Sequence, residues 1–169
     1  TLNEEEKIPL LLTDIAHQDF TDYEIILVDA KSIDQTCKIA RTISKNNKLP
    51  LKIVNVTAAN VNHQRNQGSL YAKSNLLLFC DADNRLKNSF LKELKVAYLY
   101  NKNQIIIPKM STSSPLYRIS DKIIILFLNL FYQFEKTFIS RPQIVESLML
   151  IGKNTYNKVG GLNELLSFH

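Results

Sequence analysis

The chain has 169 residues, of which 45% are hydrophobic and 22% charged, a balance that indicates one globular domain and excludes a disordered or fibrous chain. Lysine and arginine number 21 against 16 acidic residues, and the net charge of +5 suits an anionic ligand or an anionic lipid surface. The basic residues are scattered along the chain, which argues against nucleic-acid binding.

The first predicted element is a helix over residues 4–18. Pro9 fits its first turn, where a missing backbone N–H is tolerated. Its apolar face consists of Ile8, Leu11, Leu12 and Ile15. Because a helix that opens an α/β domain normally follows a strand, we expect the first strand of the sheet to be missing from this sequence.

A strand and a helix are predicted next. Residues 25–28 form a continuous apolar run that ends at Asp29, which is typical of a strand buried on both faces of a parallel sheet. Ser32 is expected to cap the following helix, with Gln35 in the capping-box position. The apolar face of this helix consists of Ile33, Cys37, Ala40 and Ile43.

The order of strand and helix then repeats. Further strands are predicted over residues 51–56, 76–80 and 105–107, and helices over residues 63–73 and from Ser89 onward. The last of these helices has an apolar face of Phe90, Leu91, Leu94, Ala97 and Tyr98. This alternation predicts an α/β fold with an open sheet.

Asp29 and the triplet Asp81-Ala82-Asp83 each follow a predicted strand. Open α/β sheets bind ligands beyond the carboxyl ends of their strands, so we expect these acids to share one crevice. Two carboxylates one residue apart can hold a hard divalent cation, which in turn neutralises a diphosphate. The alternative is structural, with Asp83-Asn84 forming a turn and Asp81 capping backbone groups.

Several short blocks occur in a fixed order along the chain. They are Thr1-Leu2-Asn3-Glu4-Glu5, residues 24–29, Asp34-Gln35-Thr36, Arg65-Asn66-Gln67-Gly68, Ala72-Lys73, residues 77–83 and residues 159–164. Together they resemble family 2 glycosyltransferases of GT-A fold, over essentially the whole chain. The resemblance implies one GT-A domain with an open mixed sheet, truncated at both ends, in which residues 1–110 bind a nucleotide sugar and residues 111–169 face the acceptor.

The resemblance also implies how the nucleoside of a UDP- or GDP-sugar is held. In similar enzymes the loop at Thr1, Leu2 and Glu4 and the acid at Asp29 contact the nucleoside. Leu2 stands where an aromatic residue often stacks on the base, and the residue after Asp29 is Ala30 where a second acid is frequent. The resemblance therefore leaves the identity of the base open.

The phosphates and a metal ion, Mg²⁺ or Mn²⁺, are expected at three further residues. By resemblance Arg65 faces the nucleotide, Asp81 contacts the ribose or the metal, and Asp83 binds the metal directly. A guanidinium suits bidentate contact with phosphate, and carboxylate oxygens suit these cations. The reaction implied is inverting hexosyl transfer to a hydroxyl of a glycan, a lipid-linked acceptor or a polysaccharide precursor.

The acceptor side is expected at Gly160, Gly161 and Glu164. Inversion requires a carboxylate base for the acceptor hydroxyl, and the resemblance places this base just beyond His169. Glu164 is also compatible with an ordinary acid at the start of a helix. His17 and His63 have no partner at useful spacing and are interpreted as surface or lightly packed residues rather than catalysts.

Residues 118–138 are predicted to form an amphipathic helix with a narrow polar stripe. The stripe consists of Lys122, Asn129, Gln133 and Lys136. One interpretation is a helix in the membrane interface near a lipid-linked acceptor, and the other is a helix packed on protein. The longest apolar run, residues 123–128, is much shorter than the ~20 residues of a membrane span.

The two cysteines bear on the compartment of the protein. Cys37 and Cys80 stand singly, which indicates neither a zinc site nor a disulfide. We therefore expect a cytoplasmic chain, which would lie at the inner face of the membrane if the helix over residues 118–138 binds lipid.

A sugar-nucleotide pyrophosphorylase would need a glycine-rich loop, and residues 1–6 contain no glycine. A non-catalytic nucleotide-sugar-binding or membrane-docking module of the same fold remains the alternative.

Overall fold

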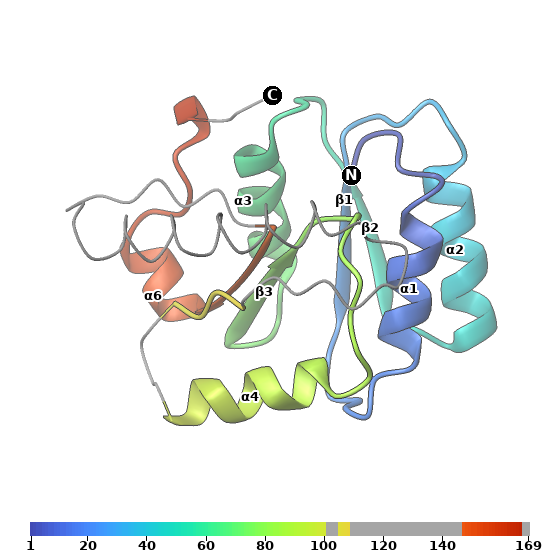
Figure 1. The fold of residues 1–169 in the computed structure, drawn as a ribbon. Coiled ribbons are helices and arrows are strands. Elements are labelled where there is room, and N and C mark those ends of the chain that lie inside the picture. Colours follow the sequence, from blue (N-terminus) through green and yellow to red (C-terminus); the bar gives the residue numbers. More distant parts are fainter. Residues whose placement is uncertain (101–104, 109–146, 167–169) are drawn as a thin grey trace, which may run out of the picture. The chain divides into compact units, whose positions relative to one another are not determined.

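The computed structural model describes residues 1–100, 105–108 and 147–166, nearly all of which belong to one compact unit of Thr1–Ile106 and Ser147–His169 (Figure 1). Its elements are α1 (Ile8–Ala16), β1 (Ile25–Asp29), α2 (Thr36–Asn47), β2 (Leu51–Asn55), α3 (Val61–Tyr71), β3 (Leu76–Cys80), α4 (Phe90–Tyr100), β4 (Leu148–Gly152), α6 (Lys153–Lys158) and the 3-10 helix η1 (Glu164–Leu166). The helix predicted over residues 118–138 lies outside the described residues.

The described strands form two sheets of two strands each (Figure 1). β1 pairs with β2 in parallel, with Ile25 opposite Leu51, whereas β3 pairs with β4 antiparallel, with Leu76 opposite Gly152. The strand expected over residues 105–107 is reduced to one antiparallel bridge from Ile106 to β4. β4 was not predicted, although residues 148–151 form an apolar run before a glycine that is typical of a buried strand.

β1 is covered on both faces, as its continuous apolar sequence predicts, whereas Lys52 and Asn55 of β2 are exposed. One face packs against α1 and α2 through the cluster Ile8, Leu12, Leu27, Ala40 and Leu49. The other face holds the cluster Val28, Ala30, Val54 and Val56 and carries α3. This burial fixes where the carboxyl end of β1, and with it Asp29, emerges from the core.

The β3–β4 sheet has a core of its own. It consists of Leu77, Phe79, Met149, Ile151 and Tyr156. The rings of Phe79 and Tyr156 lie 5.2 Å apart between centroids in a tilted arrangement, so α6 is anchored on β3. The core thereby holds the segment that follows α6 close to the end of β3.

A slot separates β1 from β3. The cavity there has a volume of about 790 Å³ and is lined by every residue from Ile25 to Val28 and from Leu76 to Cys80. Consecutive side chains of a strand point to opposite faces, so a cavity that touches all of them lies against the strand edges. Among the described strands, none therefore pairs with the edges of β1 and β3 that face each other along this slot.

Thr1 lies at one end of the slot and already pairs with the free edge of β1. Its backbone nitrogen is 2.6 Å from the carbonyl oxygen of Val28, and its carbonyl oxygen accepts a hydrogen bond of 2.9 Å from the N–H of Ala30. In a parallel ladder, a residue bonds through its N–H and its C=O to the two neighbours of the residue opposite it. Thr1 bonds in this way to Val28 and Ala30, which flank Asp29.

The start of α2 differs from the prediction. The helix begins at Thr36, and its N-cap residue Gln35 makes no capping hydrogen bond with its side chain. Ser32 donates from its hydroxyl to Asp29 instead, and Lys31 has a positive φ of 61°, so the chain is still in a loop there. Ile33, expected on the apolar face, is consequently 93% exposed.

Candidate functional site

Asp81 and Asp83 lie on a tight turn at the carboxyl end of β3. The N–H of Asp81 donates to the carbonyl oxygen of Ser147 at 2.9 Å, which extends the β3–β4 ladder by one residue. The side-chain amide of Asn84 donates to the carbonyl oxygens of Asp81 at 3.0 Å and Ser147 at 3.1 Å. The turn interpretation is therefore correct for the backbone, and the turn presents both carboxylates at the surface.

The two carboxylates have different surroundings. Nη2 of Arg65 lies 2.8 Å from Oδ1 of Asp81. The side chain of Arg65 is 15% exposed and that of Asp81 is 41% exposed. Asp83 is exposed, and within residues 1–100, 105–108 and 147–166 its carboxylate has no hydrogen bond or ion pair. Asp83 is thus the acid that stays available to an external ligand.

At the end of β1, Asp29 is 3% exposed and its carboxylate is used by the neighbouring loop. Oδ2 accepts from the N–H of Ser32 at 3.0 Å, and Oδ1 accepts from the hydroxyls of Ser32 and, at 3.3 Å, Thr1. Asp29 therefore fixes the loop that would surround a nucleoside. Contact between its carboxylate and a nucleoside would require these bonds to rearrange.

Six of the seven residues predicted on the donor side border the same cavity. They are Thr1, Leu2, Glu4, Arg65, Asp81 and Asp83, and only the buried Asp29 does not border it. Leu2 is 42% exposed, and the carboxylate of Glu4 pairs with Lys7 at 3.3 Å. The cavity includes Arg65, Asp81 and Asp83 at the carboxyl end of β3 and extends along the slot between β1 and β3.

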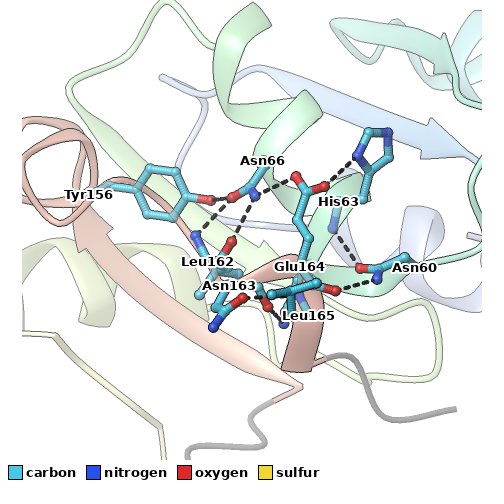
Figure 2. Close-up of polar contacts among 9 residues, drawn as sticks. Asn60, His63, Asn66, Tyr156, Leu162, Asn163, Glu164 and Leu165 are labelled. Carbon is cyan, nitrogen blue, oxygen red and sulfur yellow. Dashed lines mark hydrogen bonds and ion pairs between the residues drawn. The ribbon is translucent and has the colours of Figure 1, made fainter.

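The predicted acceptor-side residues follow α6, and of these Glu164 is bound to α3 (Figure 2). Both oxygens of Glu164 are engaged, Oε1 by the amide of Asn66 at 2.8 Å and Oε2 by Nδ1 of His63 at 3.0 Å. These two hydrogen bonds, that from Asn66 being the stronger influence, lower the pKa of Glu164 below its usual value. The interpretation of His63 as a residue without a partner was wrong.

Cys80 adjoins the acidic turn without sharing its chemistry. Burial, followed by the charges of Asp81 and Asp83, raises the pKa of the Cys80 thiol to about 12. The thiol therefore stays protonated at neutral pH, and a protonated thiol is a poor nucleophile and a poor metal ligand.

The described residues contain no group of three or more histidine, cysteine, aspartate or glutamate side chains that could enclose a metal ion. Asp81 and Asp83 offer hard oxygen atoms on a fixed turn, a donor set that suits Mg²⁺ or Mn²⁺ when a phosphate ligand completes the coordination. The residues present therefore fit a shared metal site rather than a metal cage made of protein alone.

Solved structures with the same fold are glycosyltransferases. The structure of Staphylococcus aureus TarS residues 1–349 in complex with UDP matches with a TM-score of 0.74, covering 99% of this chain and 49% of that chain at 22% identity. The mannosyltransferase PcManGT from Pyrobaculum calidifontis, in complex with GDP-Man and Mn²⁺, matches with a TM-score of 0.75, covering 97% and 46% at 22% identity. The fold is thus the GT-A fold.

The chain belongs to glycosyl transferase family 2, whose model matches residues 1–150. The poly(ribitol-phosphate) beta-N-acetylglucosaminyltransferase TarS of Staphylococcus aureus is 31% identical over 114 residues, which are 65% of this chain and 20% of TarS. A PGL/p-HBAD biosynthesis glycosyltransferase of Mycobacterium bovis is 37% identical over 86 residues, which are 51% of this chain and 34% of that protein. The chain therefore spans a fifth to a third of the length of these relatives.

No helix within the described part of the chain is long and apolar enough to span a bilayer. Residues 118–138, for which membrane contact was considered, lie outside that part.

Proposed function

We propose that this chain is the donor-binding part of a glycosyltransferase that moves a sugar from a nucleotide diphosphate sugar to an acceptor hydroxyl. The observation that carries the proposal is the end of β3, where the exposed Asp83 follows the Arg65–Asp81 ion pair along one cavity. Structures of proteins with this fold in complex with UDP, with UDP-GlcNAc and with GDP-Man and Mn²⁺ support a nucleotide sugar as the donor.

Asp81 and Asp83 are the proposed residues for Mg²⁺ or Mn²⁺. Asn84 and Ser147 fix the turn that carries them, so little reorganisation is needed when the ligand arrives. When bound, the cation supplies positive charge that stabilises the leaving nucleoside diphosphate. Arg65 adds a second positive charge at the same end of the cavity, where a guanidinium binds phosphate oxygens well.

Inversion requires a carboxylate base on the acceptor side, and Glu164 is poorly suited to that role. Both of its oxygens are engaged by α3, and its lowered pKa makes it a weaker base than an ordinary glutamate. We therefore propose that the base lies outside the described residues and that Glu164 has a structural role, in which it holds the acceptor-side turn on α3.

Calorimetry on the full-length protein tests the donor site. UDP and GDP are titrated separately in the presence of Mn²⁺, Mg²⁺ or EDTA, and one nucleotide is expected to bind only with metal. Absence of binding by both nucleotides would reject the proposal. Transfer assays with an α-linked donor then examine the chemistry, since inversion gives a β-linked product by NMR, and donor binding without any turnover would favour the non-catalytic module.

A further inference from the structure

Three consecutive residues of α3 contact three different segments of the site. The amide of Gln64 donates to the carbonyl oxygen of Thr1 at 3.0 Å. The guanidinium of Arg65 binds Asp81 at 2.8 Å. The third residue, Asn66, binds the turn that follows α6. One helix thus contacts the loop that begins at Thr1, the turn of residues 81–84 and the turn of residues 160–164 at once.

The side-chain amide of Asn66 is fully hydrogen-bonded (Figure 2). Its Oδ1 accepts from the N–H of Leu162 at 2.9 Å and from the hydroxyl of Tyr156, and its Nδ2 donates to the carbonyl oxygen of Leu162 at 2.9 Å and to Glu164 at 2.8 Å. An asparagine amide has two donor hydrogens and two acceptor lone pairs, so no capacity is left over. The amide pairs with the peptide of Leu162 in both directions, as one strand pairs with another.

Neighbouring residues of α3 reinforce this contact. Asn60 donates to the carbonyl oxygen of Glu164 at 2.8 Å, and Asn62 donates to that of Asn163 at 2.9 Å. Asn60, His63 and Asn66 recur every three residues, and this spacing places them along one side of the helix, as Figure 2 shows. The turn is therefore held along the first half of the helix rather than at one point.

The glycines of the turn are suited to this close approach. Gly160 and Gly161 both have a φ of 80°, which side chains rarely tolerate. A Cβ on Gly161 would lie 2.8 Å from Oδ1 of Asn66, whereas a Cβ on Gly160 would meet nothing within 4 Å. Position 161 thus requires glycine for two reasons, the positive φ of its backbone and the close approach of the Asn66 side chain.

α3 is itself seated closely on the β1–β2 sheet. A Cβ on Gly68 would lie 3.0 Å from Cγ2 of Val28, which leaves no room for the helix to move toward the strand. The contacts made by Arg65 and Asn66 are therefore fixed relative to the end of β1.

We propose that Asn66 is a positioning residue, which holds the turn of residues 160–164 in register with the Arg65–Asp81 pair so that the acceptor meets the donor in one orientation. The inference rests on the proposed function for the meaning of donor and acceptor. Its structural part, that Asn66 fixes the turn, stands on the hydrogen bonds alone.

The test compares Asn66→Ala and Asn66→Asp with the control Gln67→Ala in the full-length protein. Loss of the amide should raise the acceptor KM or lower kcat about tenfold, the effect of roughly one or two hydrogen bonds, while the donor Kd changes less than twofold. The amide hydrogen of Leu162 should exchange about tenfold faster. Asn66→Asp places a carboxylate against Glu164, so adding Glu164→Gln should restore part of the activity.

Two results would overturn the positioning role. Unchanged acceptor kinetics in Asn66→Ala, with faster exchange at Leu162, would show that the contact is only structural. Unchanged exchange at Leu162 would show that Asn66 does not fix the turn, and this readout remains valid even if no acceptor is turned over and the proposed function fails.

Discussion

Arg65 and Asp81 form an ion pair of 2.8 Å that joins the middle of α3 to the end of β3, across 16 positions of sequence. The pair gives the two acids of the triplet separate tasks. Asp81 is partly neutralised by the protein itself, whereas Asp83 keeps its charge exposed to solvent. Substitutions at these positions should therefore have different effects.

Asp83→Asn should strongly weaken metal-dependent nucleotide binding and leave folding unchanged. The substitution removes the available carboxylate and breaks no contact within the described residues. Calorimetry with UDP or GDP and Mn²⁺ should show at least a tenfold loss of affinity, with an unaltered urea midpoint. Asp19→Asn, at another exposed aspartate, is the matched control, and wild-type affinity in Asp83→Asn would reject the metal assignment.

Arg65→Ala should weaken donor binding by about a hundredfold and Arg65→Lys by about tenfold, because lysine keeps the charge but lacks the planar fork. The cost to folding should stay at or below about 1 kcal/mol, since Asp81 is 41% exposed and solvent screens the pair. Calorimetry and urea unfolding separate the two effects. Full donor affinity in Arg65→Ala would mean that Arg65 only orients Asp81.

Acidification should loosen the contact between the acceptor-side turn and α3. The folded-state pKa of Glu164 is lowered, so its contribution is complete above the pKa of an unfolded glutamate, about 4.3, and is lost as the pH falls through the lower folded value. His63, which binds the carboxylate, and Tyr156 are the other ionisable side chains that interact with Glu164. Exchange at the Leu162 amide, followed from pH 7 to pH 3, measures the release.

Glu164→Gln should remove this pH dependence, because an amide does not titrate. Glu6→Gln, at an exposed glutamate outside the network, should behave as the wild type does. A pH dependence that survives in Glu164→Gln would assign the release to another group.

The slot between β1 and β3 should accept one further strand, which we propose is polypeptide joined directly to Thr1. Joining a five-residue segment of alternating valine and isoleucine to Thr1 should raise the melting temperature by roughly 10 °C, because it would pair both free edges and fill the apolar slot. Amide exchange at Val28 and Leu78 should slow at the same time.

A segment of equal length with proline at alternate positions is the control, since proline cannot donate to a ladder. Equal melting temperatures for the two segments would refute the strand. Slow exchange at Val28 in concentrated protein without any added segment, together with dimer formation, would instead identify a second copy as the occupant.

Local sequence patterns predicted the elements whose structure depends on burial alone. The apolar runs gave the bounds of β3 correctly and those of β1 to within one residue, because a strand in the core needs only continuous apolar side chains and a polar residue where it leaves. The acids after those strands follow from the same rule. β4 could have been found from its own run, which lies far from the other strands in sequence.

Features that depend on distant contacts could not be predicted in the same way. Serine often caps helices, but the hydroxyl of Ser32 donates to the carboxylate of Asp29 and its oxygen accepts from the N–H of Asn3 instead. His63 and Glu164 are 101 positions apart, so the local sequence around either residue does not predict the pair. Asn66 belongs to the block Arg65-Asn66-Gln67-Gly68, but its four hydrogen bonds join it to residues 156–164, which lie next to it only in the folded chain.

The consecutive anchors Gln64, Arg65 and Asn66 make α3 sensitive to length rather than to composition. Each residue of an α-helix turns the next side chain by about 100°, so one inserted or deleted residue before Gln64 within α3 would misdirect all three contacts together. The segment between β2 and α3 absorbs such changes more easily because it is a loop. Homologous chains should therefore vary in length before Asn60 and keep a constant spacing from there to Gly68.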